Sequence, residues 1–428
     1  MSTPEGGPSG QARQSDAPEL IACPDCGLRQ LVEPVPRGFR AQCGRCGKVL
    51  ASSRSGLLAA SLALLTAAAL WWLPACLAPF MTVSANGAVR RSELASGIAA
   101  LWSAGFPSLA VVVAAFSIVV PSLYLALMIG VLVGIRLRNT SASGRDEDRW
   151  TLGRLYRWAL GLRPWAMIEV YLLGACVAYS RLQRVAFVRI GVAAWCLLAT
   201  SLCILLADAL LNDRAVWRAL PIHSARSTSR TLTAAACHVC DLAIPGGGSG
   251  DRCPRCYARL VTRKPRSIER TWALVLCGFL LFVPANLLPV LTIDQLGQEE
   301  SNTILGGVLE LGRYGLWPLA VIVFTASILI PLTKLCGLSW NLFLTSRGSA
   351  RFLVARTRLH GAIDWIGRWS NIDVFMVSIV AALVQFGELS HVRVEPGMIA
   401  FAAVVIVTMI AARSFDSRLM WDAAGERG

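Results

Sequence analysis

Apolar residues in this chain are concentrated in long runs instead of amphipathic stripes. A helix that crosses the hydrocarbon core of a bilayer needs about 20 predominantly apolar residues. Six runs are about that long, at residues 57–80, 109–135, 185–211, 272–293, 317–344 and 396–412, and two shorter runs lie at 167–179 and 371–386. Hydrophobic residues make up 55% of the chain and charged residues only 16%, as in a membrane protein. The pattern predicts a multi-pass protein with eight spanning helices.

The net charge of +15 is distributed unevenly between the loops. Arginines gather in residues 136–163 and 212–270, whereas residues 81–108 and 294–316 contain few basic residues. Because basic loops tend to stay in the cytoplasm, we expect the N-terminus and both arginine-rich loops to be cytoplasmic. One basic loop, at residues 181–189, departs from this rule. Topology explains the charge, so we expect no nucleic-acid partner.

The sequence repeats itself at a spacing of about 210 residues. Residues 73–82 and 283–292 share two prolines and a threonine. Residues 165–171 and 369–375 share a Trp, an acidic residue, a Val and an aromatic residue in the same order. These ordered matches indicate an internal duplication. Each copy has an even number of predicted spans, so the copies have parallel orientation in the membrane.

Each copy begins with four cysteines and continues into four apolar runs. The predicted fold is an all-α polytopic membrane protein of two tandem modules, each a four-cysteine zinc ribbon followed by a four-helix transmembrane bundle. The predicted boundaries are a disordered tail at 1–20, zinc ribbon 1 at 21–54, transmembrane bundle 1 at 55–220, zinc ribbon 2 at 232–263 and transmembrane bundle 2 at 268–422.

The cysteine quartets consist of paired Cys-x2-Cys motifs, which are typical of a tetrahedral zinc site. The predicted ligands are Cys23, Cys26, Cys43, Cys46, Cys237, Cys240, Cys253 and Cys256. Four protein ligands leave no open position, so we expect two structural zinc ions and no metal catalysis. Iron remains an alternative because it accepts the same ligands, whereas disulfides would need an oxidising compartment. We expect each ribbon to clamp its own helices or to dock a cytoplasmic partner.

An intramembrane polar site is predicted in the second bundle. Lys334 is the only lysine in any apolar run, and an ionisable group there is a functional hypothesis by default. Ser327 lies on the same helix face, and residues of the last two runs reach a similar depth. The predicted site consists of Ser327, Lys334, Ser370, Asp373 and Thr408. We expect Lys334 to pair with Asp373, either in a transport pathway or as a static buried pair.

The first bundle lacks this pattern. Tyr124 stands at the position of Lys334, which leaves Glu169 as the carboxylate of that bundle. We therefore expect the second bundle to be the active one. The chain has no nucleophile with a base, no phosphate loop and no open metal site, so we expect no enzyme activity.

The repeated cysteine quartets, the Leu73-Pro-Ala and Val283-Pro-Ala motifs, the Ser-x3-Pro-x2-Lys face and the terminal Phe415-Asp-Ser-Arg418 together resemble the paraquat-inducible protein A family. The resemblance covers about residues 20 to 422. It implies a Gram-negative inner-membrane protein that moves phospholipid with a periplasmic MCE-domain tunnel protein. It also implies that the polar residues of the second bundle form the family's intramembrane network.

The expected function is to load or accept phospholipid through a polar cavity in the second bundle, with proton coupling as a hypothesis. Two alternatives stay open: a non-transporting membrane anchor for the MCE tunnel, and a redox or stress sensor that uses the zinc ribbons.

Overall fold

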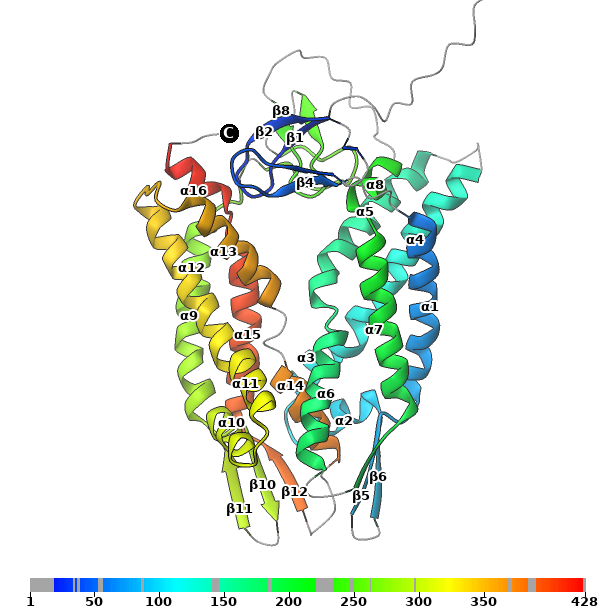
Figure 1. Cartoon of the computed structure of the whole chain (residues 1–428), viewed down its shortest axis with the longest axis vertical. Helices are drawn as coiled ribbons and strands as arrows, with labels where there is room; N and C mark the ends of the chain where they lie inside the picture. Colours follow the sequence, from blue (N-terminus) through cyan, green and yellow to red (C-terminus); the bar gives the residue numbers. More distant parts are fainter. Residues whose placement is uncertain are drawn as a thin grey trace, which may run out of the picture.

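The computed structural model describes residues 19–425, apart from gaps at 34, 37–38, 53–56, 86–87, 141–145, 184–186, 221–233, 246–249, 262, 296–297, 368–371 and 384–389. Two helical halves stand side by side, with short strands and the cysteine-containing turns at one end and β-hairpins at the other (Figure 1). We call residues 58–220 the first half, residues 267–425 the second half, and segments 19–52 and 234–261 ribbon 1 and ribbon 2. The tandem arrangement of cysteine clusters followed by helices is confirmed.

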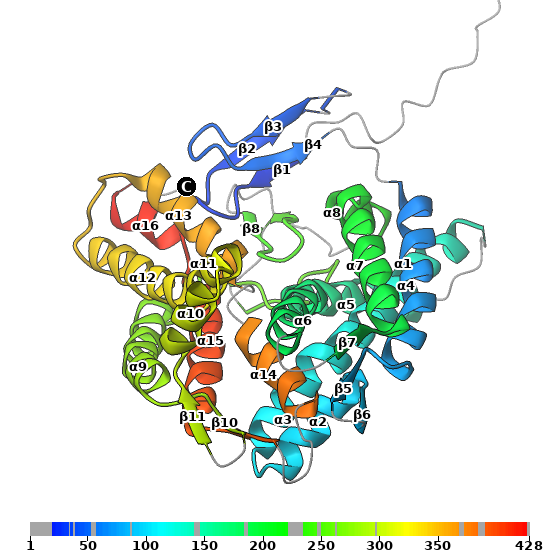
Figure 2. The same ribbon diagram turned by 60° about the horizontal axis from the view of Figure 1, so that its bottom comes forward.

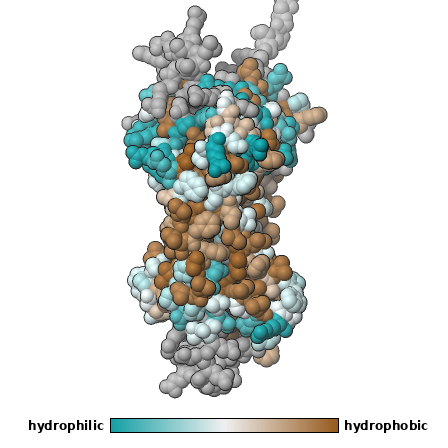
Figure 3. Space-filling model, turned by 90° about the vertical axis from the view of Figure 1, so that its left-hand side faces the viewer, coloured by the Kyte–Doolittle hydropathy of each residue, from teal (hydrophilic) through white to brown (hydrophobic). Residues whose placement is uncertain are grey.

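Seven helices in the described part of the chain are long and apolar enough to cross a membrane. The first half contains α1 (Leu58–Leu77), α3–η1–α4 (Pro107–Ala114, Ala115–Val119, Val120–Thr140), α5–η2–α6 (Asp146–Leu162, Arg163–Trp165, Ile168–Leu182) and α7 (Val192–Leu210). The second half contains α9 (Ser267–Leu287), α11–η3–α12 (Trp317–Phe324, Thr325–Leu329, Ile330–Ser346) and α15 (Pro396–Ser414). An apolar belt crosses the face shown in Figure 3 between more polar ends, as expected for a chain embedded in a bilayer.

The eighth predicted span corresponds to a shorter helix. There α13 (Leu353–Ile366) is followed by α14 (Ile372–Leu383), whose 12 described residues are fewer than a span needs. Four further short helices are α2 (Leu94–Ser103), α8 (Asp213–Ala219), α10 (Ile304–Arg313) and α16 (Arg418–Ala423).

Both long middle spans widen into a π-helical turn at equivalent places. The turns η1 and η3 contain Ser117 and Ser327, and each is followed by a proline, Pro121 or Pro331. Proline has no N–H for the carbonyl one turn earlier and its ring crowds that carbonyl. A single wider turn relieves this conflict, which explains why the motif recurs in both halves.

Each half carries a three-stranded antiparallel sheet at the end remote from the ribbons. The strand orders are β6–β5–β7 (Ala88–Ser92, Met81–Ala85, Phe187–Ile190) and β11–β10–β12 (Gln298–Asn302, Leu291–Gln295, Ser390–Val394). Gly191 and Gly397 follow the third strands, where an added Cβ would collide with the carbonyls of Pro79 and Pro289. These glycines permit the backbone of the last helix to meet the end of the first one. The sequence pattern did not predict these short strands.

The two halves repeat one packing scheme, and one helix of the second half packs against the first. In the first half α1 packs along α7, and in the second half α9 packs along α15. By contrast, α14 leaves its own half and packs against α2 and α6 of the first (Figure 1 and Figure 2). The approach of α2 is close, because a Cβ on Gly97 would collide with Ser378. The rings of Tyr171 and Phe375 meet edge to face across this joint, with centroids 5.4 Å apart.

The ribbons are small hairpin pairs. Ribbon 1 contains β1 (Glu19–Ala22), β2 (Arg29–Val32), β3 (Arg40–Gln42) and β4 (Val49–Ser52), and ribbon 2 contains β8 (Ala234–Ala236) and β9 (Ala243–Pro245). The residue after each Cys-x2-Cys has a left-handed backbone; it is glycine at Gly27 and Gly47 and a strained Asp241 and Tyr257 in ribbon 2. This turn brings the two thiols of each pair to the same side.

The ribbons are exchanged between the halves. The cysteines of ribbon 1 share a buried apolar cluster with Leu342, Phe415 and Trp421 of the second half. The cysteines of ribbon 2 belong to a cluster with Tyr156 and Trp217 of the first half. Each ribbon therefore packs on the half that it does not precede in the sequence. The expectation that a ribbon clamps the helices of its own module is wrong in this respect.

Candidate functional site

The eight ribbon cysteines form two compact clusters. Within each cluster the four sulfur atoms lie within 4.8 Å of one another, and all eight residues are buried. The Sγ atoms of Cys23 and Cys46 lie 3.5 Å apart, as do those of Cys237 and Cys256. Four sulfurs at the Zn–S distance of a tetrahedral site would be separated by about 3.8 Å. Each cluster could therefore hold one metal ion and is compatible with zinc.

A cavity of about 580 Å³ lies between the two halves below ribbon 1. It is lined by charged side chains from both halves and by apolar residues of α7 and α15. The lining residues are Lys48, Arg163, Pro164, Glu169, Leu205, Asp208, Ala209, Lys334, Gly361, Ile363, Asp364, Trp365, Gly367, Met409, Ala412 and Arg413. The predicted cavity of the second bundle is thus bounded by the first half as well.

Lys334 of α12 lies at the wall of this cavity. Only 1% of its surface is exposed, and its Nζ donates a hydrogen bond of 2.9 Å to the carbonyl oxygen of Gly367. Asp364, one helical turn before Gly367, lines the same space. The structure therefore places the predicted lysine in a polar cavity, with its ammonium group directed at the segment after α13.

Of the other predicted polar residues, the side chains of two are described. Ser327 is buried in η3, and its hydroxyl has no hydrogen-bond partner among the described residues. Thr408 is buried in α15 and donates to the carbonyl of Val405 in its own helix, at 3.0 Å. Ser370 and the side chain of Asp373 lie outside the described residues. The pairing of Lys334 with Asp373 stays a prediction.

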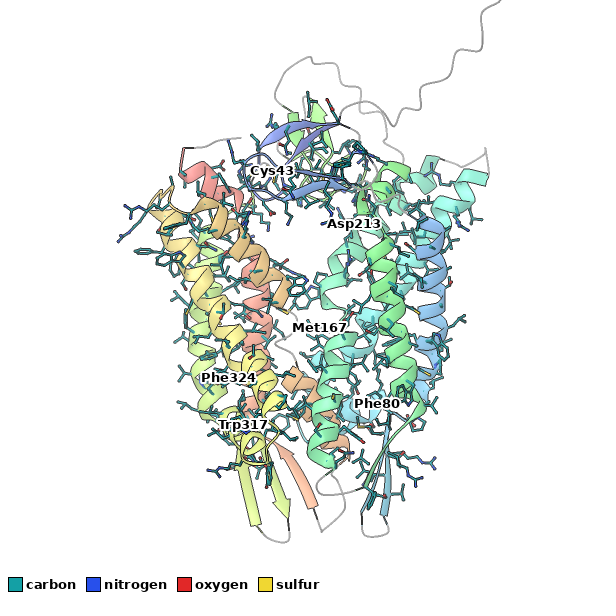
Figure 4. All side chains as sticks on the ribbon, viewed as in Figure 1. Cys43, Phe80, Met167, Asp213, Trp317 and Phe324 are labelled. Carbon is teal, nitrogen blue, oxygen red and sulfur yellow. The ribbon has the colours of Figure 1, made fainter. Side chains whose placement is uncertain are left out.

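The first half contains a polar network that the sequence reasoning missed. The hydroxyl of Tyr124 donates to Asp208 at 2.9 Å, and Nε of Arg163 donates to the other oxygen of the same carboxylate at 2.9 Å. Arg163 also lies 3.7 Å from Asp213, which accepts from Tyr156 at 2.7 Å. Asp213 lies at the ribbon end of the half (Figure 4). Asp208 is a carboxylate inside the apolar run 185–211, and that signal could have identified it.

The duplication relates this network to the surroundings of Lys334. At a spacing of 204 residues Arg163 corresponds to Gly367, Asp208 to Ala412 and Asp213 to Ser417, while Tyr124 corresponds to Lys334 at the spacing of 210. The cation comes from η2 in one half and from the middle span in the other. The second half has no acidic residue at either position that neutralises Arg163. Glu169 is therefore not the only carboxylate of the first half at the cavity.

Two more cations reach the cavity from elements that cross between the parts of the molecule. The guanidinium of Arg413 in α15 lies 4.9 Å from the ring centre of Trp165 in the first half. Trp165 in turn stacks on Phe116, with centroids 5.4 Å apart. Lys48 comes from ribbon 1, where its Nζ lies 3.2 Å from Asp25. The cavity wall thus contains residues from three separate parts of the chain.

The terminal motif of the second half forms a joint outside the membrane spans. Asp416 accepts from Nε and Nη2 of Arg418 at 2.9 Å each, and from the backbone N–H of Lys264 at 3.1 Å. Burial alone would raise the pKa of Asp416, but these hydrogen bonds and the Arg418 charge lower it below its usual value. Arg263 and Asp422 add a bidentate pair next to it, with distances of 2.6 and 2.9 Å. The joint fixes the segment between ribbon 2 and α9 to the end of α15 and to α16.

Comparisons with known proteins agree with the repeat. A family model described as paraquat-inducible protein A matches residues 58–221 and again residues 268–425. The intermembrane transport protein PqiA of Escherichia coli K12 is 30% identical over 418 residues, which cover 95% of this chain and 96% of that protein. The lipophilic envelope-spanning tunnel protein A of the same organism is 33% identical over 264 residues, 61% of either chain.

A probable intermembrane transport protein of Haemophilus influenzae is 29% identical over 265 residues, 61% of this chain and 64% of that protein. No solved structure matches the chain. The two family segments coincide with the two helical halves. On the extent of these matches, the chain belongs to the paraquat-inducible protein A family.

Proposed function

We propose that the chain is the inner-membrane component of a phospholipid transport system that connects the two membranes of a Gram-negative bacterium. Relatives named intermembrane transport proteins, one of them similar over 95% of this chain, support a transport role. In this proposal the N-terminus and both ribbons face the cytoplasm, because the arginine-rich loops lie at the ribbon end. The outer sheets then face the periplasm, where the partner is an MCE-domain tunnel protein.

The observation that carries the proposal is the cavity between the halves. A phospholipid needs polar contacts for its head group and apolar walls for its acyl chains. The cavity offers Lys334 and Arg413 beside Leu205, Ile363 and Met409. A volume of about 580 Å³ lies within the range of small-molecule sites. It suits a head group and the first part of its chains better than a whole lipid.

Two finer elements belong to the same proposal. Lys334, with Asp373 as its partner, would relay protons that drive transport, since an ionisable group inside a span is typical of proton pathways. The ions in the ribbons would be zinc, because four thiolates in a closed tetrahedron favour it. The ribbons then have a structural role and the cavity a transport role.

Photo-crosslinkable phospholipid in reconstituted vesicles tests the proposal. We expect Lys334→Met to lower crosslinking to the cavity and lipid transfer at least tenfold while protein abundance stays normal. Thr333→Met is the matched control, because Thr333 is exposed on the same helix and receives the same side chain. An equal loss of abundance and transfer in Lys334→Met would assign the lysine to the scaffold. Transfer that continues unchanged after collapse of the proton gradient would exclude proton coupling.

The same experiment addresses the anchor alternative. A chain that only seats the tunnel protein would bind its partner without any lipid reaching the cavity. Absence of crosslinked lipid in the wild-type chain, with the partner still bound, would favour the anchor.

A further inference from the structure

Each ribbon, with its cysteine cluster, packs on the half that it does not precede in the sequence. Ribbon 1 is connected to the first half through α1, yet it lies on the second half. The hydroxyl of Ser417 donates to the carbonyl of Asp25 at 2.8 Å, and the guanidinium of Arg45 lies 5.5 Å from the ring centre of Trp421. The indole of Trp421 donates to Thr357 of α13 at 3.2 Å. Ribbon 1 is therefore seated on α16 and α13.

Ribbon 2 has the reciprocal seat. It continues into α9 of the second half, but its second knuckle lies on α5 of the first half. A Cβ added to Gly153 would collide with the carbonyl of Arg255, which lies between two cysteines of the cluster. The guanidinium of Arg154 lies 5.2 Å from the ring centre of Tyr257, the residue after the last cysteine. The contact is backbone to backbone, so it requires the folded shape of the knuckle.

Both seats depend on metal for a physical reason. Segments of about 30 residues cannot bury enough apolar surface to fold alone and commonly rely on metal. Metal binding to such a ribbon supplies its folding free energy. Without metal, ribbon 1 would no longer cover the apolar residues of α13 and α16, and ribbon 2 would no longer cover those around Gly153. The half that loosens would in each case be the opposite one.

Ribbon 1 also forms part of the cavity. Its Lys48 lines the space that Arg163 and Lys334 line from the two halves. Strand β1 of ribbon 1 and strand β9 of ribbon 2 lie in contact, so the two ribbons form one layer above the halves. Figure 1 shows this layer extending from one half to the other.

We propose that the two metal-bound ribbons are reciprocal clamps: each holds the half that it does not precede, and together they keep the halves closed over the ribbon end of the cavity. Loss of metal opens that end. The inference is independent of the molecule that the cavity takes, and it assigns the cysteine clusters a part in coupling the halves beyond the stability of each ribbon.

Hydrogen exchange, measured by mass spectrometry on the full-length protein in nanodiscs, tests whether each ribbon stabilises the half that it does not precede in the sequence. We expect Cys23→Ser with Cys26→Ser to speed exchange at least tenfold in α13 and α16, while α5 and α8 keep wild-type protection. Cys237→Ser with Cys240→Ser should give the reverse pattern. Loosening confined to the half that follows each ribbon, equal loosening of both halves, or no change would each overturn the proposal.

A second experiment leaves all cysteines in place, so it stays informative where the serine variants fail to accumulate. Binding and folding are linked reciprocally, so a change at the seat must alter metal retention. In the Gly153→Ala variant, a change in the first half, we expect one of the two zinc ions per chain to be released to a chromogenic chelator at least tenfold faster than in the wild type. Gly161→Ala is the matched control in the same helix, because a Cβ there meets open space. Equal release rates in the two variants would contradict a seat on α5.

Opening of the cavity needs its own measurement. Spin labels carried by non-natural amino acids at Leu155 of α5 and Ser346 of α12 report the separation of the halves at the ribbon end, and both positions are exposed. Chelation should shift the distance distribution to longer values, and zinc should restore it. A distribution that does not respond to chelation would overturn the opening, whatever the exchange data show.

Discussion

In the first half the partly exposed cation Arg163 lies between two carboxylates, whereas in the second half the buried Lys334 donates to a backbone carbonyl at the same cavity. The positions that supply Asp208 and Asp213 in the first half are Ala412 and Ser417 in the second. The helix pairs, the π-helical turns and the outer sheets are common to both halves. Duplication has therefore preserved the scaffold, while the balance of charge at the cavity has diverged.

This difference indicates two roles. In the first half Arg163 pairs with two carboxylates, which also accept hydrogen bonds from Tyr124 and Tyr156, so the charge of the arginine is compensated inside a network that fixes the shape of its half. In the second half Ala412 and Ser417 replace these two carboxylates, and Lys334 donates to the carbonyl of Gly367 at the cavity wall that Asp364 also lines. The comparison gives the following tests, ordered from the largest expected effect to the smallest.

The largest difference in stability is expected between Asp416 at the end of the second half and the equivalent residue Asn212 at the end of the first. Asp416→Ala removes a buried carboxylate and leaves Arg418 unpaired, so we expect a loss of about 3 kcal/mol in the free energy of unfolding. The equivalent change in the first half, Asn212→Ala, removes the helix cap on the backbone N–H of Arg214, worth about 1 kcal/mol. Unfolding in detergent micelles measures both. Equal losses would show that the two joints are equivalent.

The Asp416 joint should also respond to acid. Its pKa is lowered in the folded state, so its contribution to stability is complete above the usual pKa of about 3.8. That contribution is lost as the pH falls below this value through the lowered pKa. We expect the difference in melting temperature between wild type and Asp416→Asn to be constant from pH 7 to 5 and to shrink below pH 4. A difference that grows in acid would contradict the assigned ion pair.

The first-half network should contribute more to stability than to lipid transfer. Asp208→Ala leaves Arg163 and Tyr124 without their shared acceptor, and we expect a loss of about 2 kcal/mol, reduced by the partial exposure of Arg163. Tyr124→Phe removes one hydrogen bond and should cost about 1 kcal/mol. Both are measured by unfolding, with lipid transfer as a second readout. Loss of transfer at unchanged stability would assign the network to transport instead.

A carboxylate introduced in the second half at the position equivalent to Asp208 should pair with Lys334 and lower lipid transfer. Ala412 lines the cavity with Lys334, so Ala412→Asp places an acidic group where Asp208 stands in the other half. We expect lipid transfer to fall about tenfold, which corresponds to about 1.4 kcal/mol, because the ammonium gains a competing partner. Ala412→Asn has the same shape without the charge and serves as the control. Identical behaviour of the two variants would argue against a role for the charge.

The two serines in the π-helical turns should show the smallest difference in the free energy of unfolding when each is changed to alanine. The hydroxyl of Ser117 donates to the carbonyl of Val113 at 2.7 Å, so Ser117→Ala should cost about 1 kcal/mol. Ser327 is buried without a partner among the described residues, and Ser327→Ala should leave stability unchanged. A clear drop in lipid transfer for Ser327→Ala alone would assign its hydroxyl to the transported molecule.

Much of the architecture could be predicted because it depends on local sequence. The spacing of the cysteines predicts the clusters, seven of the apolar runs coincide with described helices long and apolar enough to cross a membrane, and the duplicated motifs predict the repeat. The outer strands were missed because strands of four or five residues between spans carry too little periodicity. Asp208 was missed although a carboxylate within an apolar run was visible in the sequence.

The exchange of the ribbons could not be predicted in the same way. Sequence order places ribbon 1 next to α1, and nothing in the spacing of its cysteines indicates Trp421 as a neighbour. Its seat depends on the shape of residues several hundred positions away. The pairing of Arg163 with Asp208 likewise requires η2 and the end of α7 to meet, which apolar patterns do not specify.

The bond between Ser417 and Asp25 joins residues 392 positions apart, almost the whole length of the chain. At a synthesis rate of about 5 to 20 residues per second, ribbon 1 waits about 20 to 80 s after its emergence before its seat exists. During that interval its thiols are complete and able to take up metal, while the helices that they will cover are still being inserted. A chain that stops before residue 417 lacks the hydroxyl that holds Asp25 and the Trp421 ring beside Arg45, although α13 of the same seat is already made.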